Sequence, residues 1–143
     1  MYKSQNTLSK IIDFTGIGLH SGERVKISLI PTAIDTGINF KINNTLILAS
    51  WQNAVVSQLC TRLKFGENAI STIEHLMAAI SGLGITNLII KINSNEVPIL
   101  DGSSKEFVDE IRNVGITEQN KKQKKLKILK KVEHKDQEKF IHI

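Results

Sequence analysis

The chain has 143 residues, of which 41% are hydrophobic and 23% charged, so it can form a folded domain and is not a disordered polymer. Its opening residues, MYKSQNTLSKII, contain no uninterrupted apolar segment, and we expect neither a secretory signal nor an integral membrane segment. The single cysteine, Cys60, excludes an internal disulfide framework and favours a reducing compartment, so we expect a cytoplasmic protein.

The net charge of +5 is concentrated in the C-terminal tail. Residues 121–143 contain nine lysines and three acidic side chains, a net charge of +6, whereas the rest of the chain carries −1. A role in binding nucleic acid or an anionic surface would depend on this tail, which has almost no arginine or aromatic side chains to read or stack bases. We therefore expect no nucleic-acid partner, and a non-catalytic basic binding module is the alternative function.

Residues 7–65 show mainly the alternation that is typical of β-strands. In ERVKISLI, three apolar residues alternate with polar ones, as a sheet with one solvated face requires, and GINFKI repeats the pattern. We predict further strands at 53–58 and 60–65. The segment TGIGLHSG lies between strands, and its glycines allow either a hairpin turn or a close approach of Leu19 and His20 to a ligand.

The period then changes to that of a helix. An apolar stripe at i, i+3, i+4, i+7 and i+10 predicts a helix that ends at Gly82 or Gly84. The stripe consists of Ile73, Leu76, Met77, Ile80 and Leu83.

A strand and a second helix follow. The unbroken apolar stretch of NLIIKI predicts a strand that is buried on both faces. Ser103 and Glu106 fit a capping box for a helix that stops at Gly115. Its expected inward-facing residues are Phe107, Val108, Ile111 and Val114.

Together these elements predict an α+β fold, a mostly antiparallel sheet packed with two helices. We expect this domain to span residues 1–118. Residues 119–143 would continue a polar linker, TEQNKKQKK, into a truncated β-hairpin that resembles the start of a second domain.

Glu74 and His75 are the first candidates for chemistry. Ser71 and Glu74 have the spacing of a capping box, and this structural interpretation is favoured by the residues alone. A lone histidine such as His75 is likewise more often a packed or surface residue than a ligand. Adjacent helix positions point about 100° apart, so the pair cannot chelate one ion. One side chain could still bind a metal while the other contacts a water that the metal holds.

HKDQE contains a second candidate pair. His134 and Glu138 stand at i, i+4, which on a helix would suit zinc. Short β-type apolar stretches flank this polar centre, so we predict a hairpin turn and assign structural roles to His134, Glu138 and His142.

Four motifs in this order, TGIGLHSG, LCTRL, ISTIEHLMAAISGLGITNL and NEVPILDGSSKEFV, closely resemble the bacterial zinc-dependent UDP-3-O-acyl-N-acetylglucosamine deacetylases of lipid A biosynthesis. The resemblance runs from about residue 5 to 118 and continues more weakly into the tail. It implies two similar α+β domains with a Zn²⁺ site at their junction, and hydrolysis of the acetamide of a UDP-linked acylated glucosamine.

The resemblance also implies roles for particular residues. Glu74 matches the family's general base and His75 its first zinc ligand. Leu19 and His20 match positions that line the substrate pocket, and Cys60 lies near that pocket.

The family's other two zinc ligands come from a His-Lys-x-x-Asp motif in the second domain. A histidine that donates a proton and the passage for the acyl chain also lie there, and this sequence contains none of these features. We therefore expect the chain alone to be inactive, and the exposed face of its domain to allow self-association.

Overall fold

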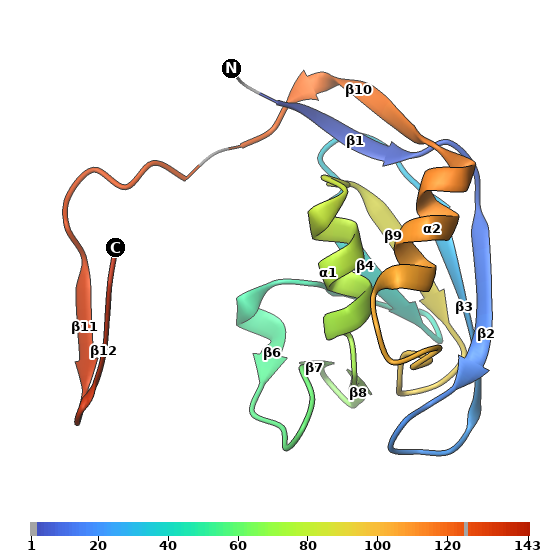
Figure 1. Cartoon of the computed structure of the whole chain (residues 1–143), viewed down its shortest axis with the longest axis horizontal. Helices are drawn as coiled ribbons and strands as arrows, with labels where there is room; N and C mark the ends of the chain where they lie inside the picture. The colour runs from blue at the N-terminus through green and yellow to red at the C-terminus, as the bar shows by residue number, and fades with distance from the viewer. Residues whose placement is uncertain (1–2, 125) are drawn as a thin grey trace.

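A five-stranded sheet covered on one face by two helices forms the body of the protein (Figure 1). The structure, a computed structural model, describes residues 3–124 and 126–143. The sheet consists of β2 (Ile12–Ile17), β3 (Arg24–Pro31), β4 (Ile38–Ile42), β5 (Thr45–Leu48) and β9 (Leu88–Ile92). The strand order is β2-β3-β9-β4-β5, and every neighbouring pair is antiparallel except β4 with β9. The predicted α+β fold with a mostly antiparallel sheet is confirmed.

Alternation in β3 follows the prediction. Val25, Ile27 and Leu29 are completely buried against the helices, whereas Arg24 and Lys26 are exposed on the other face. Because successive side chains of a strand point to opposite faces, one hydrophobic face and one solvated face result.

The prediction that NLIIKI is buried on both faces is wrong. Leu88, Ile90 and Ile92 of β9 are buried, but Ile89 is only half-buried and Lys91 is exposed. The reason is that both helices pack on the same face of the sheet, so the other face stays open to solvent (Figure 1).

Helices α1 (Glu74–Gly82) and α2 (Lys105–Val114) lie side by side over the sheet (Figure 1). Their buried residues are Leu76, Ala79 and Ile80 in α1, and Phe107 and Ile111 in α2. The Phe107 ring meets the Phe14 ring of β2 edge-on, with 4.9 Å between centroids, a favourable aromatic geometry. Glycines follow both helices with positive φ, +72° at Gly84 and +90° at Gly115, as the sequence predicted.

The capping box predicted for α1 is wrong. The helix begins at Glu74 itself, Ile73 occupies the N-cap position, and no side chain caps it. Ser71 lies outside the helix and donates its backbone N–H to the carbonyl of Asn95 at 2.9 Å. Glu74 is therefore not engaged as a capping residue.

The capping box of α2 also differs from the prediction. Ser104, not Ser103, stands at the N-cap position, without a capping hydrogen bond from its side chain. The hydroxyl of Ser103 instead accepts the N–H of Lys105 at 3.0 Å and bonds the carboxylate of Asp101.

Two terminal strands cross above the helices. β1 (Ser4–Leu8) pairs antiparallel with β10 (Ile116–Lys122), which extends the folded body beyond the expected start of the linker (Figure 1). The expectation that residues 117–122 form part of a linker is therefore wrong. This strand escaped prediction because its side chains are polar and partly or fully exposed.

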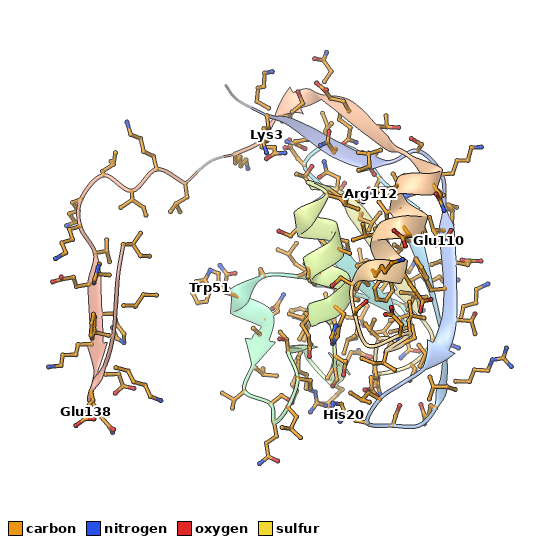
Figure 2. All side chains as sticks on the ribbon, in the orientation of Figure 1. Lys3, His20, Trp51, Glu110, Arg112 and Glu138 are labelled. Carbon is orange, nitrogen blue, oxygen red and sulfur yellow. The ribbon has the colours of Figure 1, made fainter. Side chains whose placement is uncertain are left out.

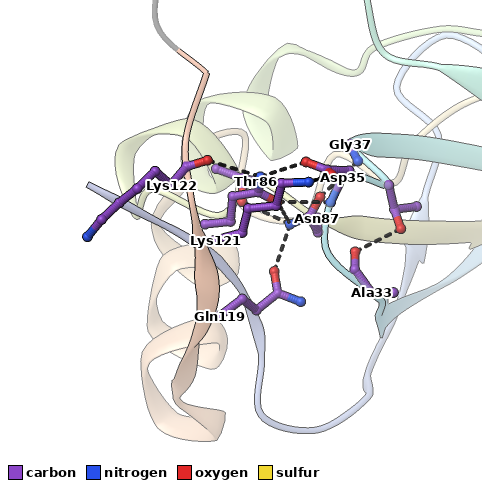
Figure 3. Close-up of polar contacts among 10 residues, drawn as sticks. Ala33, Asp35, Gly37, Thr86, Asn87, Gln119, Lys121 and Lys122 are labelled. Atoms are coloured by element: carbon purple, nitrogen blue, oxygen red, sulfur yellow. Dashed lines mark hydrogen bonds and ion pairs between the residues drawn. The ribbon is translucent and has the colours of Figure 1, made fainter. Parts of the chain in front are cut away.

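Buried amides join β10 to the sheet. Asn87, which is 1% exposed, donates to the side-chain oxygens of Gln5 at 2.8 Å and Gln119 at 2.7 Å, and accepts the N–H of Gly37 at 2.9 Å (Figure 3). Lys121 adds an ion pair with Asp35. Because buried polar groups are costly when unpaired, this network fixes the path of β10.

A small sheet lies at the edge of the body. It contains β6 (Ala54–Val55), β7 (Arg62–Phe65) and β8 (Asn68–Ile70), preceded by the short 3-10 helix η1 (Trp51–Asn53). The strands expected at 53–58 and 60–65 are thus shorter than predicted. Trp51 projects away from the body (Figure 2) and is 82% exposed.

The predicted hairpin is present as β11 (Glu133–Asp136) and β12 (Lys139–His142), and it stands apart from the body (Figure 1). His134 lies in β11 and Glu138 in the tight turn at the hairpin tip (Figure 2), so HKDQE is the predicted turn and not a helix. Across residues 3–124 and 126–143, no helix is long and apolar enough to cross a membrane.

Candidate functional site

Glu74 and His75 open helix α1, and both are half-buried. Glu74 is the acidic residue in the first turn of α1, where the helix dipole interacts favourably with negative charge. The two side chains leave the helix in different directions because neighbouring residues are rotated by about 100°. The carbonyl of His75 accepts the hydroxyl of Ser104 at 2.9 Å, which ties the start of α1 to the start of α2.

Backbone contacts bring Cys60 to the same place. Glu74 Oε2 accepts the N–H of Thr61 at 3.0 Å, and the N–H of Ile73 reaches the carbonyl of Thr61 at 3.4 Å. Cys60 is therefore one residue away from the peptide that holds the Glu74 carboxylate. Its half-buried thiol lies 3.2 Å from the hydroxyl of Ser57.

The glycine-rich loop is held by Glu96. The carboxylate of Glu96 accepts the N–H of His20 at 2.9 Å and the N–H of Ser21 at 2.8 Å, although these residues are more than 70 positions away. Gly22 has φ +67° with open space around it, which supports the turn interpretation of TGIGLHSG. Gly18 has a different reason to be glycine, since a Cβ there would lie 2.5 Å from Glu96 Oε2.

Glu96 also binds the turn that leads into α1. The hydroxyl of Thr72 donates to Glu96 Oε1 at 2.9 Å. Burial opposes ionisation of Glu96, but the hydrogen bonds from His20, Ser21 and Thr72 outweigh it and lower the pKa to about 2. The carboxylate is therefore ionised at neutral pH inside the protein.

Thr72 has a strained backbone. Its φ is +58°, a left-handed conformation that is rare for a β-branched residue and costs on the order of 1–3 kcal/mol. Thr72 is 2% exposed and lies two residues before Glu74. Such conformations persist only where the surroundings enforce them, and they are common next to functional sites.

A groove with a volume of about 410 Å³ lies between the glycine-rich loop and the segment that contains Cys60. It is lined by His20, Ser21, Glu23, Ser57, Gln58, Cys60, Ser71, Ser94, Asn95 and Glu96. Two of the residues predicted to bind substrate, His20 and Cys60, therefore face one cavity.

The remaining predicted residues lie around this groove. Leu19 is 58% exposed next to His20, and Glu74 joins the site through its bond to Thr61. Neither these two nor His75 is among the residues that line the groove.

Sequence reasoning missed Glu96 and Thr72. Within NEVPILDG, the one available signal for Glu96 was an acidic residue next to the apolar run VPIL. A carboxylate beside such a run requires hydrogen bonds if it is buried.

The side chain of His75 is the kind of donor that zinc binds. The imidazole of His75 is a common zinc ligand, and it makes no hydrogen bond to any residue that the structure describes. Residues 3–124 and 126–143 contain no group of three or more His, Cys, Asp or Glu that could hold an ion. A catalytic zinc normally has three protein ligands, so the residues that the structure describes do not provide a complete set by themselves.

Comparison with known proteins places residues 5–143 in one family. Residues 5–143 match the family described as "LpxC: UDP-3-O-acyl N-acetylglycosamine deacetylase". A UDP-3-O-acyl-N-acetylglucosamine deacetylase of Legionella pneumophila (strain Corby) is 41% identical over 141 residues, which is 96% of this chain and 46% of the relative.

Two further relatives carry the same name. The Teredinibacter turnerae protein is 45% identical over 139 residues, covering 94% of this chain and 46% of the relative. The Acinetobacter baumannii (strain ATCC 17978) protein is 43% identical over 133 residues, covering 90% and 44%. The chain spans about half the length of these curated relatives. It belongs to the UDP-3-O-acyl N-acetylglycosamine deacetylase family.

Proposed function

We propose that this chain supplies the first part of a zinc-dependent deacetylase that hydrolyses the acetamide of UDP-3-O-acyl-N-acetylglucosamine in lipid A biosynthesis. The relatives are named for that substrate. The observation that carries the proposal is the bond from Thr61 N–H to Glu74 Oε2, because it holds a carboxylate next to Cys60 and the groove. We also propose a cytoplasmic location, supported by the single cysteine.

Glu74 is the general base in this proposal. Oε2 is held by the N–H of Thr61, while Oε1 makes no hydrogen bond to the described residues and can accept a proton from water. A carboxylate oriented by one oxygen presents the other in a fixed direction, which reduces the entropic cost of the proton transfer.

His75 is the proposed zinc ligand. Its backbone is fixed by α1 and by the hydroxyl of Ser104, which limits the directions that its ring can take. Zinc, when bound, polarises a carbonyl and lowers the pKa of a bound water. The other protein ligands would lie outside this chain, so we propose that the 143 residues alone have no deacetylase activity.

Leu19, His20 and Cys60 are the proposed substrate contacts. The exposed side chain of Leu19 offers apolar surface, while the imidazole of His20 and the thiol of Cys60 face the groove. A sugar carries hydroxyl groups that such polar side chains can bind, and the groove volume of about 410 Å³ can hold part of a ligand of this size.

A full-length chimera tests the proposal. Residues 5–143 replace the matched part of the L. pneumophila deacetylase, and acetate release from UDP-3-O-acyl-N-acetylglucosamine is measured. Glu74→Gln should lower turnover by about two to four orders of magnitude, the usual contribution of a general base. Glu110→Gln is the control, because Glu110 is exposed on the outer surface of α2 (Figure 2).

Zinc content separates the two roles. His75→Ala should reduce the zinc retained by the chimera, whereas Glu74→Gln should leave it near normal. A chimera that unfolds cooperatively, retains zinc and releases no acetate would contradict the proposed function. Equal turnover with and without Glu74→Gln would contradict the role of Glu74.

A further inference from the structure

Glu96 is the one charged side chain among the buried residues that the structure describes, with 3% of its surface exposed. It belongs neither to the groove's predicted substrate contacts nor to the Glu74–His75 pair. Burying a charge is expensive unless hydrogen bonds compensate, so its surroundings need an explanation.

Both carboxylate oxygens of Glu96 are occupied. Oε1 accepts the N–H of His20 and the hydroxyl of Thr72, each at 2.9 Å, and Oε2 accepts the N–H of Ser21 at 2.8 Å. Three donors thus converge on one group, and each bond is charge-assisted. A glutamine could not replace it, because its NH₂ would face an N–H donor whichever way the amide is turned.

The donors come from two segments that make up the candidate site. His20 and Ser21 belong to the glycine-rich loop, and Thr72 precedes the Glu74–His75 pair. The backbone around Glu96 adds two bonds to the second segment, Ser71 N–H to the carbonyl of Asn95 at 2.9 Å and Val97 N–H to the carbonyl of Ser71 at 3.0 Å.

Space around the carboxylate is tightly limited. A Cβ on the buried Gly18 would lie 2.3 Å from Ser21 Oγ and 2.5 Å from Glu96 Oε2, well inside van der Waals contact. The loop therefore comes this close to Glu96 only with glycine at position 18. The hydroxyl of Thr72, whose strained backbone has a φ of +58°, bonds the same carboxylate.

We propose that Glu96 is a positioning residue that fixes the substrate-contacting loop at His20 relative to the turn that orients Glu74 and His75. This proposal rests on the proposed function, because that function assigns roles to the loop at His20 and to the Glu74–His75 pair. Because both segments bond the same ionised carboxylate, a shift of one segment moves the other. The groove between them therefore keeps its width.

Amide hydrogen exchange in the 143-residue chain tests this role. In Glu96→Gln the amide oxygen can keep the two bonds of Oε1, so Ser21 loses its acceptor and His20 does not. Exchange at the Ser21 amide should then accelerate by about tenfold to a hundredfold, the equivalent of one charge-assisted hydrogen bond. Glu23→Gln is the matched control, because Glu23 is an exposed carboxylate that lines the same groove.

A reciprocal variant tests the coupling itself. Thr72→Val keeps the side-chain shape but removes the hydroxyl donor. If Glu96 links the segments, the NMR signals of the His20 and Ser21 amides should shift in Thr72→Val, because both amides donate to the carboxylate that the hydroxyl has left. A role that is only local to one segment would leave them unchanged.

Two results would overturn the proposal: Ser21 exchange in Glu96→Gln that equals the rate in Glu23→Gln, or unmoved loop signals in Thr72→Val. Should Glu96→Gln fail to fold, the Thr72→Val spectra decide, because that variant keeps the carboxylate and removes only the hydroxyl donor. A chimera without deacetylase activity would leave all of these measurements unaffected.

Discussion

Gly18→Ala is the sharpest test of how the glycine-rich loop is built. Gly18 has no positive φ, so alanine meets no backbone strain there. The added Cβ would nevertheless lie 2.3 Å from Ser21 Oγ and 2.5 Å from Glu96 Oε2. Ordinary contacts to carbon begin about 1 Å further out, so the serine and the carboxylate must both move.

The size of the effect follows from what that movement breaks. Moving Glu96 Oε2 by about 1 Å takes it out of range of the Ser21 N–H, which it now meets at 2.8 Å. A hydrogen bond to a charged group contributes about 1.5–3 kcal/mol. Alanine restricts the unfolded chain more than glycine does, which returns about 0.4–1 kcal/mol. We expect a net loss of about 0.5–2.6 kcal/mol in the free energy of unfolding.

Urea unfolding of the 143-residue chain, followed by circular dichroism, measures this loss. Gly82→Ala is the control, because Gly82 lies in α1 and a Cβ added there would meet nothing within 4 Å, while alanine favours helix by up to about 1 kcal/mol. Gly18→Ala should thus destabilise and Gly82→Ala should not. Unchanged or increased stability in Gly18→Ala would refute the packing argument.

Three other outcomes are expected. The ionised Glu96 contributes stability that is fully present above its unfolded pKa of about 4.5 and is lost as pH falls toward its folded pKa of about 2. The free energy of unfolding of Glu96→Gln should therefore lack this dependence on pH in acid titrations. Asn87→Ala should lower the free energy of unfolding by about 3 kcal/mol in urea titrations, because three polar partners each lose a bond worth about 1 kcal/mol. A loss of less than half this value would contradict the prediction. Trypsin should cut at the exposed Lys124, Lys127, Lys130 or Lys131 and leave the body intact. Amide protection in 126–143 equal to that of β9, in a demonstrated monomer, would contradict a weakly held tail.

The sheet and the helices could be predicted because hydrophobic burial repeats with a local period. Val25, Ile27 and Leu29 alternate along one strand, and Leu76 and Ile80 stand one turn apart on α1. Each pattern needs only a short window of sequence. The helix stops at Gly84 and Gly115 were equally local, since they depend on one residue that tolerates positive φ.

The missed features depend on partners that are distant in the chain. β10 is polar, and it is held by Asn87 and by pairing with β1, about 30 and 110 residues away. The capping box of α1 failed because Ser71 has the Asn95 carbonyl as a partner and Glu74 has Thr61. The local spacing was compatible with a cap, but both residues form tertiary hydrogen bonds instead.

The resemblance assigned roles that spacing alone could not. Periodicity placed Glu74 and His75 on a helix and favoured the interpretation of Glu74 as a capping residue. What supports a chemical interpretation is the release of Glu74 from capping, together with its bond to the peptide after Cys60. A residue's role here is thus indicated by which distant backbone it contacts.

Glu74 and Glu96 stabilise the candidate site in the same manner, because each accepts hydrogen bonds from backbone N–H groups. Glu74 holds the backbone at Thr61, and Glu96 holds the backbone at His20 and Ser21, so each fastens a stretch of backbone that lies outside the strands. Each bond contributes to stability, but most of the stability of the sheet and helix core comes from buried apolar side chains. Loss of either carboxylate should therefore loosen the loops around the groove while the body remains folded. In the full-length chimera, acetate release should then fall more steeply than the free energy of unfolding, which is the order expected when a rigid scaffold carries its chemistry on loops.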